Sequence, residues 1–152
     1  MTQEQKELLL KDLCARLPYG VKISIPDLWT QKREIEILDE IFKGDDGLYR
    51  VNSKGQCIEH IKPYLFPLSS MTEEQEEELI TITNGKFRYM WGDINNAIPR
   101  KNTSEWGISE NAFINGIKVI NILYTWLLKN HFDINGLIPM GLANDATGKN
   151  IY

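Results

Sequence analysis

The chain has 152 residues, of which 42 % are hydrophobic and 25 % are charged, and its net charge is −4 at pH 7. Aromatic residues make up 10 % of the chain, which is too many for a disordered protein. The acidic balance makes nucleic acid an unexpected partner, because backbone phosphates attract clustered Lys and Arg. No apolar run reaches the roughly 18–20 residues that span a bilayer, and the first residues lack the pattern of a secretion signal. We therefore expect a cytoplasmic protein without a membrane partner, folded as a single domain over residues 1–152.

An N-terminal helix is predicted over residues 3–17. Thr2 and Gln5 have the spacing of a capping box, in which each side chain binds the backbone N–H of the other residue. Four leucines share one face at helical spacing: Leu9, Leu10, Leu13 and Leu17. Four charged residues are expected to lie mostly away from that face: Glu4, Lys11, Asp12 and Arg16.

A strand-rich part is predicted over residues 18–68. Apolar and polar residues alternate over 21–25 and 33–38, which is typical of half-buried strands. Two further short strands, within 48–51 and 56–61, flank a hairpin loop. Consecutive pairing is the simplest topology, so we expect a small antiparallel β-meander or barrel-like sheet over residues 21–61.

A proline-punctuated segment then separates the strands from a more helical part, residues 72–140. Pro63 and Pro67 lack the N–H that a helix interior or a central strand needs, so the sheet is expected to end before them. Thr72 and Gln75 form a second capping box, which predicts a middle helix over residues 72–83.

An aromatic segment at residues 86–91 leaves two alternatives open. Phe87, Tyr89 and Trp91 alternate with other residues, so the segment is a candidate further strand of the sheet. Lys86 and Arg88 lie between the aromatic residues, and aromatic side chains beside cations can hold single-stranded nucleic acid. The acidic net charge favours the core strand over nucleic-acid binding.

A long C-terminal helix is predicted over residues 110–130. Its apolar residues recur every three or four positions: Phe113, Ile117, Ile120, Tyr124 and Leu127. We expect this stripe to form much of the core, so that a charge placed at Ile120 would unfold the protein. Together the elements predict an α+β fold.

No pattern of metal-binding or cofactor-binding residues is present. Cys14, Cys57, His60 and His131 are the soft ligands of the chain, but they lack the close pairs of a structural zinc site. There is no phosphate-binding glycine motif and no nucleophile motif. We therefore expect no cofactor, no metal and no recognisable catalytic residues. Both cysteines are expected to be reduced and at least partly buried.

An enzyme whose site is assembled from distant residues remains an alternative. Its candidates are His60 and His131, with Glu59 and Asp133 as neighbouring carboxylates. His131 and Asp133 are either an acid–base pair or part of a helix end. A deep polar pocket containing one histidine and two carboxylates would favour the enzyme.

Three segments together resemble a family of small uncharacterised proteins from gut Bacteroidales and their phages or other mobile elements. The segments are 17–22 (LPYGVK), 62–74 (KPYLFPLSSMTEE) and 126–138 (WLLKNHFDINGLI). In that family RLPYGVK, KPYLRPMSSMTEEE and DWLNAHHFDYRGLI recur in this order. The resemblance implies a shared framework but no catalytic residues. Phe66 and Asn135 stand where the family often has arginine, so an arginine-dependent partner contact would be lost here.

These observations favour a small non-enzymatic protein-interaction module, encoded by a phage or mobile element in line with the resemblance. The expected partner is an unknown protein. Candidate interface residues are Tyr64, Phe66 and Trp106, because aromatic side chains dominate binding hot spots. The alternatives are the small enzyme around His60 or His131 and a single-stranded nucleic-acid binding protein.

Overall fold

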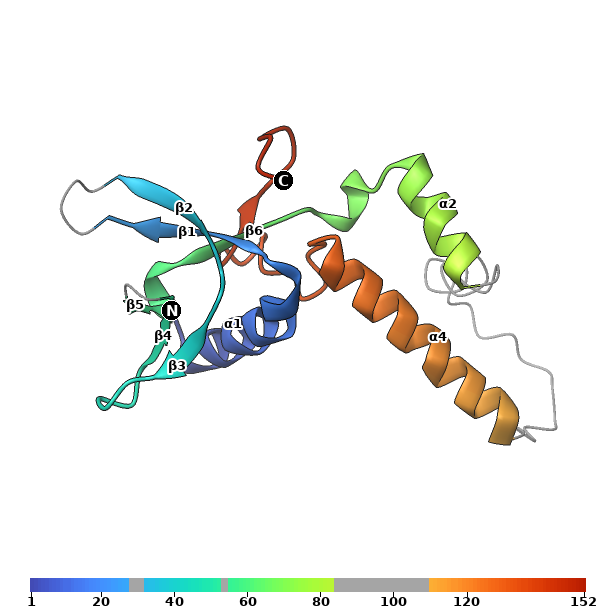
Figure 1. Ribbon diagram of the computed structural model, residues 1–152, viewed down its shortest axis with the longest axis horizontal. Coiled ribbons are helices and arrows are strands. Elements are labelled where there is room, and N and C mark those ends of the chain that lie inside the picture. Colours follow the sequence, from blue (N-terminus) through green and yellow to red (C-terminus); the bar gives the residue numbers. More distant parts are fainter. Residues whose placement is uncertain (28–31, 53–54, 84–109) are drawn as a thin grey trace. The chain divides into compact units, whose positions relative to one another are not determined.

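The computed structural model of the protein describes residues 1–27, 32–52, 55–83 and 110–152, with only the backbone of residues 110–116 (Figure 1). Its helices and antiparallel sheets confirm the α+β class. The chain divides into two compact units, Met1–Ser70 with Leu127–Tyr152, and Met71–Trp126. The predicted strand at 86–91 and Trp106 lie outside the described residues.

Helix α1, Gln3–Arg16, begins and ends close to the predicted bounds. The hydroxyl of Thr2 accepts the Gln5 N–H at 3.2 Å, and the Gln5 side-chain oxygen accepts the Thr2 N–H at 2.9 Å. This reciprocal pair satisfies two N–H groups that have no partner within the helix. A short 3-10 turn, η1 (Leu17–Tyr19), follows, and Gly20 reverses the chain with a φ of 63°.

The predicted strands are divided between two sheets, and the smaller of them is an antiparallel meander. The four-stranded sheet has the order β2-β1-β6-β7, and the three-stranded sheet has the order β3-β4-β5. The strands of the first sheet are β1 (Lys22–Pro26), β2 (Arg33–Ile37), β6 (Lys62–Leu65) and β7 (Asn144–Asp145). Those of the second are β3 (Ile41–Lys43), β4 (Tyr49–Val51) and β5 (Gln56–Cys57), with the 3-10 turn η2 (Ile58–His60) following. Consecutive pairing holds within β1–β2 and β3–β4–β5, but β6 returns to pair with β1, and β7 joins β6 in parallel.

Two backbone hydrogen bonds fix which residues of β1 and β2 bind each other. The Leu38 N–H donates to the Val21 carbonyl at 2.9 Å, and the Asp27 N–H donates to the Lys32 carbonyl at 2.7 Å. Because hydrogen-bonded and non-hydrogen-bonded pairs alternate in an antiparallel ladder, odd-numbered residues of β1 bind even-numbered residues of β2. The remaining backbone groups of both strands point away from this ladder.

Pro63 lies inside the sheet, contrary to the expectation that it would end it. It is paired with Ile23 of β1, whose backbone groups are used toward β2. This pair therefore needs no N–H from Pro63. On its other side, β6 pairs with β7 only from Tyr64 onward. The missing donor thus falls where neither neighbouring strand requires one, which is why a proline is tolerated in an interior strand.

The core of the first unit is a single cluster of aliphatic side chains. Its buried members come from α1, both sheets, η2 and the segment after α4: Leu9, Leu13, Val21, Ile23, Ile25, Leu38, Val51, Ile58, Ile61, Leu65, Leu137, Leu142 and Ala143. The buried leucines of α1 confirm the predicted apolar face of that helix.

The second unit contains α2, Glu73–Ile82, and most of α4, Glu110–Lys129. Thr72 caps α2 as predicted: its hydroxyl accepts the Gln75 N–H at 3.3 Å, and the Gln75 side chain accepts the Thr72 N–H at 3.0 Å. Glutamates occupy the first turn, where negative charge stabilises the helix dipole.

The predicted core face of α4 is confirmed at Leu127, which is buried, but it is wrong at its three other described positions. Ile120 is 52 % exposed, and Ile117 and Tyr124 are exposed as well, whereas Val119 and Trp126 are buried. No described residue of α4 belongs to the main core cluster. The helix carries apolar residues on more than one side, so spacing alone could not identify the side that is covered.

Charges at adjacent positions of α4 should therefore have unequal effects. We expect Val119→Asp to lower the free energy of unfolding by about 2 kcal/mol or more, because it buries a carboxylate. Ile120→Asp should change it by less than about 0.5 kcal/mol, because the side chain lies in solvent. Urea unfolding of the two variants measures the difference, and equal destabilisation would contradict the assigned faces.

Candidate functional site at the open sheet edge

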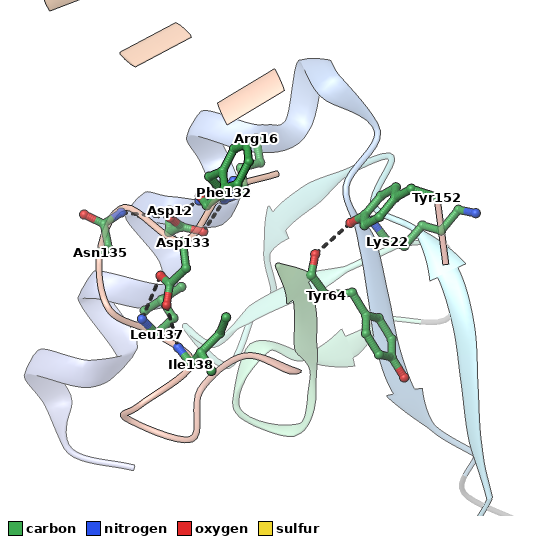
Figure 2. A network of polar contacts seen from close by, with 10 residues as sticks. All are labelled: Asp12, Arg16, Lys22, Tyr64, Phe132, Asp133, Asn135, Leu137, Ile138 and Tyr152. Carbon is green, nitrogen blue, oxygen red and sulfur yellow. Dashed lines mark hydrogen bonds and ion pairs between the residues drawn. The ribbon is translucent and has the colours of Figure 1, made fainter. Parts of the chain in front are cut away.

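A buried ion pair connects α1 with the segment after α4 (Figure 2). Asp12 and Arg16 have fully buried side chains, with Nε to Oδ2 at 2.7 Å and Nη2 to Oδ1 at 3.1 Å. Arg16 Nη2 also donates to the Phe132 carbonyl at 2.7 Å, and Asn135 Nδ2 donates to Asp12 Oδ1 at 2.8 Å. Asp12 and Arg16 are therefore buried as each other's counter-charge, and the distant residues Phe132 and Asn135 add one hydrogen bond to each. Arg16 Nη1 has no hydrogen-bond partner among the described residues.

The carboxylate of Asp133 stabilises the loop that follows by accepting two backbone hydrogen bonds. Its two oxygens accept the backbone N–H groups of Leu137 and Ile138, each at 2.8 Å (Figure 2). Both oxygens thus bind the backbone, and within the described part of the chain no hydrogen bond joins this carboxylate to the His131 ring. Of the two alternatives for His131 and Asp133, the structural role at a helix end fits this geometry.

His131 is buried and follows the last turn of α4. Its φ of 59° lies in the left-handed region, and its ring stacks on Tyr152 with centroids 4.1 Å apart. Burial, helped by the charges of Arg16 and Lys22, lowers the pKa of the imidazole to about 4. At neutral pH the ring is therefore an uncharged packing element.

The other candidates of the enzyme hypothesis lie apart from His131. His60 is exposed at the end of η2, and Glu59 forms an ion pair with Lys6 on α1. Both cysteines are free, but Cys14 is exposed rather than buried, and Cys57 is half-buried. Among the described residues, no three His, Cys, Asp or Glu side chains are grouped as metal ligands. The structure thus does not bring the proposed catalytic residues together.

The candidate interface residues Tyr64 and Phe66 lie on and just after β6. Both are half-buried. The ring of Phe66 contacts those of Phe132 and Tyr152, with centroids 6.2 and 5.7 Å apart. Lys149 Nζ lies 5.7 Å from the centre of the Tyr64 ring. Trp106 and the aromatic segment 86–91 lie outside the described residues, so nucleic-acid binding through that segment remains a prediction.

Tyr152 joins β1 to β6 through its side chain (Figure 2). Its hydroxyl oxygen accepts the Lys22 N–H at 3.0 Å, and its O–H donates to the Tyr64 carbonyl at 2.7 Å. Lys22 and Tyr64 would be the next pair of the β1–β6 ladder after Ile23 and Pro63. Burial raises the pKa of Tyr152 to about 12, so the hydroxyl keeps the proton that it donates. Sequence reasoning missed this residue, which carries no local motif.

The outer edge of β2 is the most distinctive exposed feature of the described chain. β2 is the end strand of its sheet, and Ile35 and Ile37 are 49 % and 55 % exposed. By the alternation of the β1–β2 ladder, the backbone groups of Arg33, Ile35 and Ile37 point outward from this edge. Among the described residues, side-chain donors reach this outward row only at the Ile37 carbonyl, which accepts from Asn52 Nδ2 at 2.8 Å. The edge therefore presents a short row of backbone donors and acceptors beside two aliphatic side chains.

An open hollow of about 450 Å³ adjoins this edge. It is lined by residues of β1, β2 and the C-terminal segment: Lys22, Ile35, Glu36, Ile37, Asn150 and Ile151. A smaller hollow of about 140 Å³ lies between α1 and the second sheet and includes Glu7, Glu59 and Cys57 in its wall. Neither hollow is lined by a histidine, so neither has the composition that would favour the enzyme hypothesis.

The chain has no match among protein-family models, curated proteins or solved structures. Within the described residues, every helix is too short or too polar to cross a bilayer. The site must therefore be judged on its own geometry.

Removing one charge of the buried pair should strongly destabilise the protein. We expect Asp12→Asn to lower the free energy of unfolding by about 3–5 kcal/mol, because Arg16 then remains buried without a counter-charge. The double variant Asp12→Leu/Arg16→Met should be more stable than Asp12→Asn, because it buries no unpaired charge. Denaturant unfolding measures both, and a loss below about 1 kcal/mol for Asp12→Asn would contradict this role.

His131 should make stability depend on pH. The folded state lowers its pKa from 6.5 to about 4, so between these values the unfolded chain binds the proton more readily. The contribution is therefore fully present above pH 6.5 and decreases as the pH falls toward 4. From pH 7 to 5 we expect wild type to lose about 1–2 kcal/mol more than His131→Asn. Asparagine suits the positive φ and does not titrate. Parallel stability profiles would contradict the neutral buried imidazole.

Proposed function

We propose that the protein is a non-enzymatic protein-interaction module and that the outer edge of β2 is its docking surface. The observation that supports this most is the exposure of Ile35 and Ile37 on an end strand. Apart from the Ile37 carbonyl, no described residue pairs with the outward backbone groups of this strand. Such an edge is a template for pairing with another chain. The structural roles of Asp133 and His131 leave little support for the enzyme alternative.

We also propose where the protein originates and in which compartment it acts. The resemblance of three segments to small proteins of gut Bacteroidales and their phages suggests an origin in a phage or mobile element. We also propose a cytoplasmic location, and the two free cysteines are compatible with a reducing compartment. The location of its gene among phage structural, replication or anti-defence genes would test this setting.

Affinity capture with the full chain as bait tests the proposed interaction. We expect wild type to retain a protein partner in a near-stoichiometric amount from a lysate of the native host. The double variant Ile35→Lys/Ile37→Lys should retain it at least about tenfold less, because the added charges are not accommodated in an apolar contact. Ile120→Lys, which changes an exposed isoleucine elsewhere, is the matched control and should behave as wild type. Recovery of no stoichiometric partner, or of the same partner by all three baits, would count against the proposal.

A further inference from the structure

We propose that the outer edge of β2 binds an extended peptide segment, in which apolar and basic residues alternate, as an added antiparallel strand. The inference rests on the proposed interaction function and specifies the chemistry of the partner. It is carried by three features of the edge: its backbone groups, its apolar face and its acidic face.

The backbone groups define an extended partner. The outward N–H and C=O of Ile35 can exchange two hydrogen bonds with one residue of an antiparallel strand. The outward groups of Arg33 extend the ladder in one direction, and the Ile37 N–H extends it in the other. Asn52 Nδ2 already occupies the Ile37 carbonyl at 2.8 Å, so the ladder ends there. A helix or a compact loop could not satisfy donors and acceptors spaced along a strand in this way.

One face of the edge selects apolar residues. Ile35 and Ile37 lie on the same face of β2, because side chains two positions apart point to the same side. Both line the hollow of about 450 Å³ beside the C-terminal segment. An apolar side chain opposite Ile35 would cover the exposed aliphatic surface and extend toward this hollow.

The other face selects basic residues. Glu34 and Glu36 lie on the opposite face of β2 from Ile35. Glu36 accepts the Asn52 side chain at 3.1 Å. An ionised carboxylate has about four acceptor sites, so it can pair with more than one donor at once. An added strand that places valine or isoleucine opposite Ile35 places its neighbouring residues opposite the two glutamates. Lysine or arginine at those positions forms favourable cross-strand pairs.

A second copy of the chain is a poorer occupant for the same reason. In each antiparallel register that pairs Ile35 with Arg33, Ile35 or Ile37 of another β2, a glutamate faces a glutamate. Like charges directly opposite each other destabilise strand pairing. The charge pattern thus disfavours self-association and favours a basic partner.

The test uses the whole 152-residue chain and a synthetic peptide of alternating lysine and valine, about ten residues long. We expect saturable binding in an NMR titration, with the amides of Ile35 and Ile37 shifted and newly protected from exchange. A peptide with glutamate in place of lysine should bind at least about tenfold more weakly.

N-methylation of the peptide tests the backbone contacts separately from the side chains. If valine residues face β2 as proposed, methylating their amides should abolish binding, because those N–H groups donate to the edge. Methylating the lysine amides should leave binding within about threefold, because those groups point away from β2. Equal loss with both peptides, or shifts that map away from β2, would overturn the proposal.

Two sets of protein variants complete the test. Ile35→Pro removes an outward N–H without removing a bond to β1 and should abolish peptide binding, whereas Ile35→Val should retain it. Glu34→Lys/Glu36→Lys should reverse the preference toward the glutamate peptide. Should Ile35→Pro fail to fold, the methylated peptides still decide the question.

The outcomes separate this inference from the proposed function. If no peptide binds, but wild type captures a native partner that Ile35→Lys/Ile37→Lys does not, strand addition is overturned and the interaction module remains supported. If the peptide binds as described but no native partner is recovered, the proposed chemistry of the edge is supported and the interaction module is contradicted. Self-association of the free protein through β2 would identify a second copy as the occupant and overturn the proposal.

Discussion

The fold of the first unit depends on the guanidinium of Arg16, which is fully buried and must therefore be paired. Asp12 supplies the counter-charge from one turn earlier in α1, and the Phe132 carbonyl supplies an acceptor from far along the chain. The same interaction neutralises a charge in the interior and fixes the start of the C-terminal segment against α1. Asp133 then holds the following loop, from which Leu137 enters the core.

From this anchor the C-terminal segment reaches the sheet that carries the candidate site. β7 pairs with β6, and Tyr152 then joins β6 to β1 through its hydroxyl. Ile151, beside Tyr152, forms one wall of the hollow next to β2. The surroundings of the open edge are thus set by a segment that the buried arginine fixes in place.

Local patterns in the sequence predicted much of the secondary structure. The capping boxes at Thr2 and Thr72 located two helix starts, because capping depends on residues only three positions apart. Alternation located β1 and β2, but it could not show that Ile35 and Ile37 remain exposed, because the rule assumes that the apolar side is covered. The proposed docking surface was missed for this reason.

Other features depend on partners distant in the chain, which local patterns do not contain. Asp12 and Arg16 have the spacing of a surface ion pair, and only Phe132 and Asn135 make a buried one possible. Pro63 is compatible with a strand only because of the phase of its pairing with Ile23. The candidate interface residues Tyr64 and Phe66 were chosen for their aromatic rings, and the ring of Phe66 contacts other aromatic rings of the same chain.

The hydroxyl of Tyr152 has a consequence for the dynamics of the sheet. In an ordinary ladder, the exchange of a backbone amide with solvent reports the separation of two strands. Here the Lys22 amide is held by a side chain of the C-terminal segment, so it becomes accessible whenever that segment lifts, even while β1 and β6 stay paired at Ser24 and Lys62. The exchange rate of this one amide therefore measures the local detachment of the chain's last residues, separately from unfolding of the domain.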